Sequence, residues 1–137
     1  MDYDKLRTLL RKHEGYKEKI YTCSAGKITI GVGHNLTDLG LDPDVIELQF
    51  AHDIESAINT CKSLFDTWHN LPDMVQVVLA DMAFNLGFHR LSKFRRMIKA
   101  VNANDFQTAS IEMLDSKWAN QVGDRANELS EIMGNQI

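Results

Sequence analysis

Three side chains with complementary chemistry lie in the stretch from His13 to His34. Glu14 carries a carboxyl group, Cys23 follows nine positions later with a thiol, and Thr29 follows fifteen positions after Glu14 with a hydroxyl. A carboxylic acid can donate a proton to a leaving group, a thiolate can act as a nucleophile or activate water, and a hydroxyl can hold a water molecule. Together these groups could carry out a hydrolysis.

Each of the three residues also has an ordinary structural interpretation. Glu14 could be a surface residue at the end of a helix, although the negative end of the helix dipole disfavours an anion there, which supports a functional role. A free Glu titrates near ~4.3, so a proton donor near neutral pH needs a partly buried, apolar site that raises its pKa. Cys23 could be a loop residue without a role, and Thr29 could be a β-branched residue that suits a strand.

A helix and a small sheet are predicted to position these groups. Leucines recur on one face of a helix over about 3–13, which places Glu14 at the helix end. Extended segments are expected at 19–22 and 27–33, with a tight turn between them. In the second segment, apolar residues alternate with Thr29 and glycines, which predicts a strand with one face on a core and the other open to a ligand.

The rest of the chain is predicted to be helical. Asp42 and Pro43 are typical of a helix start, and that helix should end near Phe65. A second, largely apolar helix should begin at Asp73 and end with Gly87 as its C-cap. A loop is expected at 35–41, and shorter helices at 92–100, from Asn104 and after Gly123. About six helices and one small antiparallel sheet make the fold class α+β, dominated by helices.

Composition indicates one globular domain. The 137 residues can bury a core, and 44% are hydrophobic and 25% charged. No apolar run reaches membrane-spanning length, and a net charge of −4 gives no general attraction to nucleic acid. A local cationic cluster is interpreted as a solvated helix face rather than a polymer contact. It consists of Arg90, Lys93, Arg95, Arg96 and Lys99.

The two cysteines, Cys23 and Cys61, allow at most one disulfide. The N-terminal segment is a charged amphipathic helix rather than a signal peptide, so free thiols in a reducing cytosol are expected. Cys61 falls on the apolar side of its predicted helix, which indicates a buried structural thiol. Too few ligating side chains group together to predict a metal site.

Four blocks of sequence carry a resemblance to a known family. The spacing of Glu14, Cys23 and Thr29, with KIY before the cysteine and TIGVGH from the threonine onward, is the first block. AFNLG at 83–87, SKWANQ at 116–121 and Arg125 follow in order. The chain thereby resembles phage-type lysozymes, glycoside hydrolase family twenty-four, over nearly its whole length.

The resemblance implies a lysozyme-like fold. A sheet-bearing lobe is expected at about 14–50, and a helical lobe at about 66–137 together with 1–13. A long helix would join the two lobes, with the active-site cleft between them. The chain is shorter than its relatives between His34 and Asp53.

The resemblance also implies an activity. The protein is expected to be a lysozyme (muramidase) that cleaves the β-1,4 bond between N-acetylmuramic acid and N-acetylglucosamine in peptidoglycan. Glu14 would be the general acid, while Cys23, where the family often has Asp, and Thr29 would manage the nucleophilic water. No cofactor is implied.

Five further residues are assigned by the resemblance. Phe84, Asn35 and Arg125 match substrate-side positions, and Arg125 is expected to approach Glu14. His34 and Asp53 match a pair that supports the structure.

The expected partner is the glycan strand of peptidoglycan, with neither nucleic acid nor membrane insertion. A monomer is expected, held in the host bacterial cytoplasm until a holin or a particle delivers it to the wall in the periplasm.

Two alternatives to the hydrolase stay open. A lytic transglycosylase works with a single catalytic Glu and forms an anhydro sugar without water. A wall-binding or particle component could instead have kept the fold without turnover.

Overall fold

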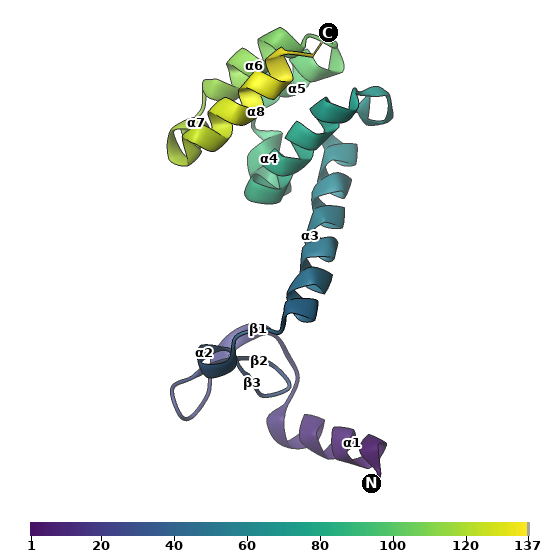
Figure 1. Cartoon of the computed structure of the whole chain (residues 1–137), viewed down its shortest axis with the longest axis vertical. Helices are drawn as coiled ribbons and strands as arrows, with labels where there is room; N and C mark the ends of the chain where they lie inside the picture. The colour runs from purple at the N-terminus through teal and green to yellow at the C-terminus, as the bar shows by residue number, and fades with distance from the viewer. Residues whose placement is uncertain (137) are drawn as a thin grey trace. The chain divides into compact units, whose positions relative to one another are not determined.

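The computed structural model describes residues 1–136 and shows two compact units, Met1–Leu48 and Gln49–Ile137 (Figure 1). The first unit holds a helix and a small sheet, and the second is helical. This confirms the α+β class. The expected division into a sheet-bearing lobe at 14–50 and a helical lobe at 66–137 with 1–13 concerns how the parts associate, and it stays a prediction. None of the described helices is long and apolar enough to cross a membrane.

The first unit runs from a helix into a three-stranded antiparallel sheet of order β1-β2-β3. Asp2 caps the first helix by accepting a hydrogen bond from the Lys5 N–H at 2.9 Å, and Gly15, at φ 80°, ends it. The elements are α1 (Tyr3–Glu14), β1 (Lys17–Thr22), β2 (Ile28–Gly31), β3 (His34–Asn35) and α2 (Leu36–Leu39).

A tight turn joins β1 to β2, as the sequence predicts. The Cys23 N–H donates to the Lys27 carbonyl at 2.9 Å, and the Gly26 N–H donates to the Cys23 carbonyl at 2.9 Å. Gly26 adopts φ 77°, a conformation that glycine reaches without the steric cost of a Cβ. The turn sets the register, in which Tyr21 pairs with Thr29.

The prediction for the two faces of β2 is wrong. Thr29 is 4% exposed, whereas Ile28 is 46% exposed. Thr29 lies on the central strand, paired with Tyr21 on β1 and Asn35 on β3, and its hydroxyl bonds back to the Lys27 carbonyl. Among the described residues of Met1–Leu48, no hydrophobic side chain is buried, so no apolar core draws Ile28 inward.

The second unit buries a core of its own. Its largest fully buried side chains are each expected to contribute about 1.5–3 kcal/mol through removal from water; they are Phe65, Leu79, Met82, Leu91, Met97, Met113 and Met133. The elements are α3 (Pro43–Leu64), which begins before this unit, the short 3-10 helix η1 (Trp68–Asn70), α4 (Asp73–Ser92), α5 (Arg95–Asn102), α6 (Phe106–Leu114), α7 (Lys117–Val122) and α8 (Asp124–Gly134).

Helix α3 is held by packing in its C-terminal part. Ala57 and Cys61 are its buried residues, so the prediction of a buried thiol at Cys61 is confirmed. Burial raises the pKa of the Cys61 thiol to about 12. Cys61 and Cys23 are both free thiols.

The helix that begins at Asp73 is interrupted at Gly87, as predicted: Gly87 adopts φ 76°, outside the helical range, and a further helical segment continues to Ser92. Two other local expectations are wrong. The predicted loop at 35–41 contains α2, because Asn35 caps a short helical turn. The predicted cap Asn104 adopts φ 57°, and Asp105 is the N-cap of α6. The described residues form eight α-helices rather than about six.

Candidate active site

Glu14 is the last residue of α1, and its side chain lies against the bare backbone of Gly33. A Cβ placed on Gly33 would lie 2.6 Å from Glu14 Oε2 and 2.9 Å from Cδ. Gly33 also adopts φ +63°, which disfavours any larger residue. The glycine therefore provides the space that the carboxyl group occupies.

Cys23 lies at the end of β1, where the turn directs backbone N–H groups toward its sulfur. Hydrogen bonds from the backbone of Lys27, and then of Ala25, lower the pKa of the Cys23 thiol; burial opposes this, and the Thr29 hydroxyl adds to the lowering. Hydrogen bonds to the charged form of a group favour that form. The turn is thus built to favour a thiolate at Cys23.

Thr29 links Cys23 to the sheet. Its hydroxyl donates to the Lys27 carbonyl at 3.0 Å and also lies within hydrogen-bonding reach of Cys23. A hydroxyl has one proton to donate and two lone pairs that accept. While the proton is shared between Lys27 and Cys23, the oxygen remains an acceptor for a water molecule.

The structure places Glu14, Cys23 and Thr29 in the same unit, on three consecutive elements. They come from the end of α1, the β1–β2 turn and the centre of β2. This unit therefore supplies an acid, a thiol with a lowered pKa and a hydroxyl. No group of three His, Cys, Asp or Glu side chains able to hold a metal occurs within residues 1–136.

His34 and Asn35 make local hydrogen bonds near the end of the sheet. The His34 ring is bonded through Nε2 to the Gly40 carbonyl. Asn35 Oδ1 accepts from the Asp38 N–H at 3.0 Å, and Asn35 Nδ2 donates to the Asp38 carboxylate at 2.9 Å. Asp53 accepts from Gln49 at 3.1 Å. The pairing of His34 with Asp53 and the substrate contact of Asn35 stay predictions.

Phe84 lines an apolar hollow in the helical unit. The hollow has a volume of about 320 Å³, and the Phe84 ring meets the Phe50 ring edge to face at 5.9 Å. Phe84 is 46% exposed, so it is not fully buried in the core of the helical unit. Its contact with sugar stays a prediction. The lining residues are Phe50, Ile54, Ala57, Ala80, Asp81, Phe84 and Arg125.

Arg125 is held by a residue that the sequence did not single out. Its Nε donates to Asp81 Oδ1 at 2.8 Å, and a terminal nitrogen lies 2.7 Å from the same oxygen. The only signal for Asp81 is a carboxylate in an otherwise apolar helix. The carboxylate compensates the guanidinium charge within this unit, and the expected approach of Arg125 to Glu14 stays a prediction.

The hydrogen bond of the Trp118 indole was also not predicted from the sequence. Its Nε1 donates to Asn85 Oδ1 at 2.7 Å and links α7 to α4. Trp118 and Asn85 both lie in sequence blocks on which the family resemblance rests, but those blocks do not show that the two side chains contact each other.

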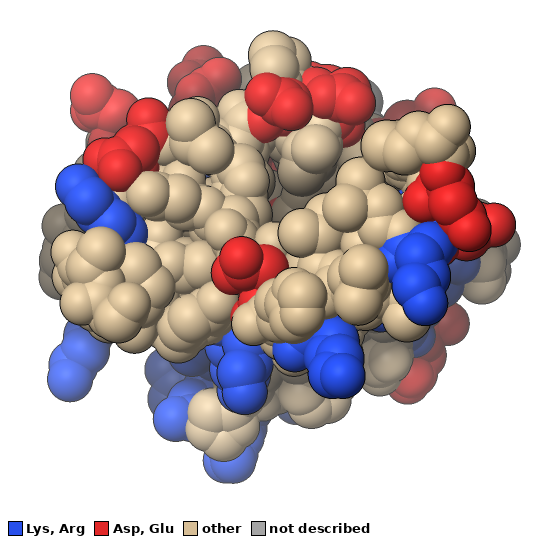
Figure 2. Space-filling model, turned by 90° about the horizontal axis from the view of Figure 1, so that it is seen from below, with Lys and Arg blue, Asp and Glu red and all other residues tan. Residues whose placement is uncertain are grey.

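Surface charge is mixed on the face shown in Figure 2, where Lys and Arg, Asp and Glu all occur among uncharged residues. No single sign of charge covers that face.

Comparisons with known proteins agree on one family. Residues 11–131 match the family model described as Phage lysozyme. The chain is 26% identical to Probable T4-type lysozyme 2 of Dictyostelium discoideum over 93% of its own length and 92% of that protein. It is 26% identical to the Endolysin of Acyrthosiphon pisum secondary endosymbiont phage 1, over 81% and 75%. It is 27% identical to Peptidoglycan hydrolase gp36 of Pseudomonas phage phiKMV, over 93% of this chain and 15% of that protein.

Proposed function

Because the chain belongs to the phage lysozyme family, we propose that it hydrolyses peptidoglycan at the β-1,4 bond between N-acetylmuramic acid and N-acetylglucosamine. The observation that carries the proposal is the position of the Glu14 side chain against Gly33, in the same unit as the Cys23–Thr29 pair. Hydrolysis of a glycoside needs an acid for the leaving oxygen and a group that manages the opposite face of the sugar.

Glu14 supplies the proton. In the proposed step, the Glu14 carboxyl transfers its proton to the glycosidic oxygen while the bond from that oxygen to the anomeric carbon breaks. The positive charge that develops on the sugar is met by the carboxylate left behind and by an incoming water molecule.

Cys23 and Thr29 manage the water. The Thr29 oxygen accepts one hydrogen bond from the water and fixes its position, and the Cys23 thiolate takes its proton as the oxygen bonds to the anomeric carbon. The lowered pKa of Cys23 supports this role, because it favours the thiolate form that accepts the proton. Transfer of a proton back to Glu14 restores the enzyme.

Glu14→Gln tests the proposal. The substitution keeps the size and hydrogen-bonding shape of the side chain and removes the acid, so it should abolish nearly all clearing of purified peptidoglycan while circular dichroism and thermal melting stay unchanged. A folded Glu14→Gln protein that clears peptidoglycan at the wild-type rate would refute the assignment.

The mass of the product separates hydrolysis from its rival. A hydrolase leaves a reducing muramic acid end, whereas a transglycosylase leaves an anhydro sugar that is lighter by one water. Mass spectrometry of the released muropeptides should show the hydrated product alone.

A further inference from the structure

The peptide unit between Lys27 and Ile28 is hydrogen-bonded on both sides. Its carbonyl accepts from the Cys23 N–H at 2.9 Å and from the Thr29 hydroxyl at 3.0 Å, so both lone pairs of the carbonyl are used. Its N–H donates to the Thr37 hydroxyl at 2.8 Å. Because a peptide unit is planar, the direction of the N–H also fixes the direction of the carbonyl.

The Thr37 hydroxyl stands where a neighbouring strand would otherwise supply the acceptor. Strand β3 ends at Asn35, which pairs with Thr29. The chain then turns into α2, whose N-cap is Asn35. On this side Ile28 therefore meets a side chain of α2 instead of a strand backbone, and the orientation of its N–H depends on one hydroxyl group.

A second contact joins α2 to the same point of the chain. Lys27 Nζ lies 3.2 Å from Asp38 Oδ1, and the other carboxylate oxygen of Asp38 accepts from the Asn35 amide at 2.9 Å. The side chains of Lys27 and Asp38 are 40% and 50% exposed, so solvent screens this ion pair and its contribution is small. The bond to Thr37 acts directly on the backbone and is the more specific of the two links.

Both groups that bind the Lys27 carbonyl belong to the proposed function, on which this inference rests. Cys23 is the proposed base, and the pKa of its thiol is lowered first by the backbone of Lys27. Thr29 donates its proton to the Lys27 carbonyl, which turns the remaining lone pairs of its oxygen toward the water that it is proposed to hold. Rotation of this one peptide unit would therefore misalign the base and the water site together.

We propose that Thr37 is a positioning residue for the hydrolysis, because its hydroxyl fixes the orientation of the Lys27–Ile28 peptide unit. Thr37 acts through that peptide unit on Cys23 and Thr29. A water molecule that replaced the hydroxyl would satisfy the Ile28 N–H, but it would not tie that N–H to α2. The loss should consequently appear in the rate more than in the stability of the fold.

Thr37→Val tests this role, since valine replaces the hydroxyl by a methyl group of similar size. It should lower kcat on solubilised peptidoglycan about 5- to 20-fold, less than the roughly 100-fold of a full 1 Å misplacement, and leave KM unchanged. Thr37→Ser keeps the hydroxyl and should restore most of the rate. If valine disturbs α2, Thr37→Ala removes the same hydroxyl with a residue that suits a helix.

Thr8→Val is the matched control. The Thr8 hydroxyl donates to the Asp4 carbonyl at 3.0 Å within α1 and makes no contact with the β1–β2 turn. The same substitution in the same unit should therefore keep the wild-type kcat.

A second measurement needs no turnover. The rate at which iodoacetamide alkylates Cys23, followed against pH by mass spectrometry of the peptide that contains it, reports the pKa of its thiol. In Thr37→Val the midpoint should move to higher pH, because hydrogen bonds that favour the thiolate are weakened. The nearest charges in this network, Lys27 and Asp38, are paired with each other and are left in place by the substitution.

The proposal is wrong if the folded Thr37→Val protein keeps either the wild-type kcat or the wild-type alkylation midpoint. It is also wrong if Thr8→Val loses as much rate as Thr37→Val. Failure of the proposed function is a separate result, namely the absence of peptidoglycan hydrolysis by the wild-type protein. In that case the alkylation midpoint alone decides whether Thr37 orients the peptide unit.

Discussion

Replacing Gly33 by alanine should misplace the proposed general acid without unfolding the protein. The new Cβ would lie 2.6 Å from Glu14 Oε2, whereas ordinary contact begins near 3.4 Å, so the oxygen must move by 3.4 − 2.6, or about 0.8 Å. The Glu14 side chain is exposed and can swing away. The fold therefore tolerates the added methyl group, while the carboxyl group leaves the position in which it meets the substrate.

Gly33→Ala is expected to lower both the stability of the protein and its catalytic rate. A left-handed backbone at φ +63° costs an alanine about 1–2 kcal/mol of stability. Displacement of a catalytic group by about 1 Å costs about 100-fold in rate, so a shift of about 0.8 Å should lower kcat about 10- to 100-fold. Initial rates on solubilised peptidoglycan and the melting temperature measure the two effects separately.

Gly31 provides the matched control. It adopts φ +67°, and a Cβ placed there meets nothing within 4 Å. Gly31→Ala should therefore lose a similar amount of stability and keep a much larger share of its rate. If the two folded variants lose the same activity, the contact between Gly33 and Glu14 has no role in catalysis and the reasoning fails.

Four further predictions concern other residues. Cys23→Asp should keep substantial activity and extend it to lower pH, whereas Cys23→Ala should lose much of it, as rates across a pH series would show. Iodoacetamide should label Cys23 well before the buried Cys61, counted by mass spectrometry. Phe84→Ala should cost about 1 kcal/mol rather than the 3–5 of a core aromatic, because the ring is 46% exposed, and should instead raise KM. Hydrogen bonds from Thr108 lower the pKa of Asp105, so its stabilisation is present above the ordinary Asp pKa and lost as pH falls; the stability advantage of wild type over Asp105→Asn should therefore shrink in acid melting experiments.

Features that depend on neighbouring residues in the sequence were predicted correctly. The helix starts at Pro43 and Asp73 follow from short-range backbone chemistry, since proline at the first position and an acid in the first turn favour a helix N-terminus. The tight turn before Ile28 is local in the same way. The break at Gly87 was also predicted, as a helix C-cap, but a further helical segment follows it, in which Leu91 is fully buried.

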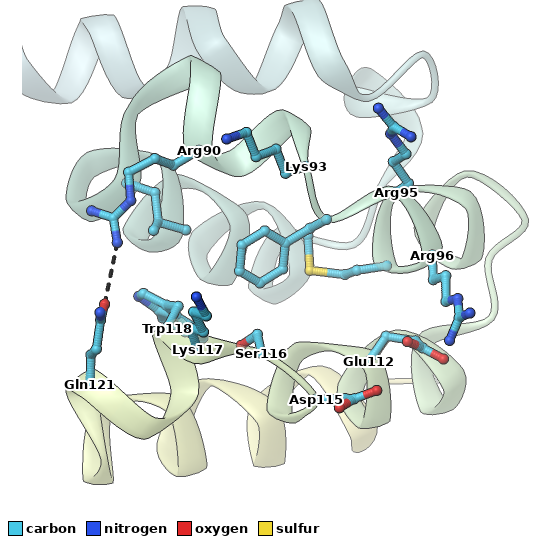
Figure 3. A pocket seen from close by; sticks show the side chains of 13 residues that line it. Arg90, Lys93, Arg95, Arg96, Glu112, Asp115, Ser116, Lys117, Trp118 and Gln121 are labelled. Carbon is cyan, nitrogen blue, oxygen red and sulfur yellow. Dashed lines mark hydrogen bonds between the residues drawn. The ribbon is translucent and has the colours of Figure 1, made fainter.

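Features that depend on distant contacts were not predicted. Which face of β2 is buried depends on the parts of the chain that pack over the sheet, and alternation along one strand cannot show it. Asp81 and Arg125 are separated by 44 positions, so neither indicates the other. Glu112 and Asp115 line the same pocket of the helical unit as Arg90 and Lys93 (Figure 3) but come from a different part of the chain, so the pattern of one helix face does not indicate them.

The uneven burial of α3 has a consequence for local unfolding. Its 22 residues span about 33 Å at 1.5 Å each, yet Ala57 and Cys61, its buried residues, both lie in the C-terminal half. Isolated helices shorter than about 12–15 residues are marginal in water. The turns around Cys61 are thus held by packing within Gln49–Ile137 as well as by backbone hydrogen bonds, so protection of backbone amides against hydrogen exchange should be greatest in that part of the helix.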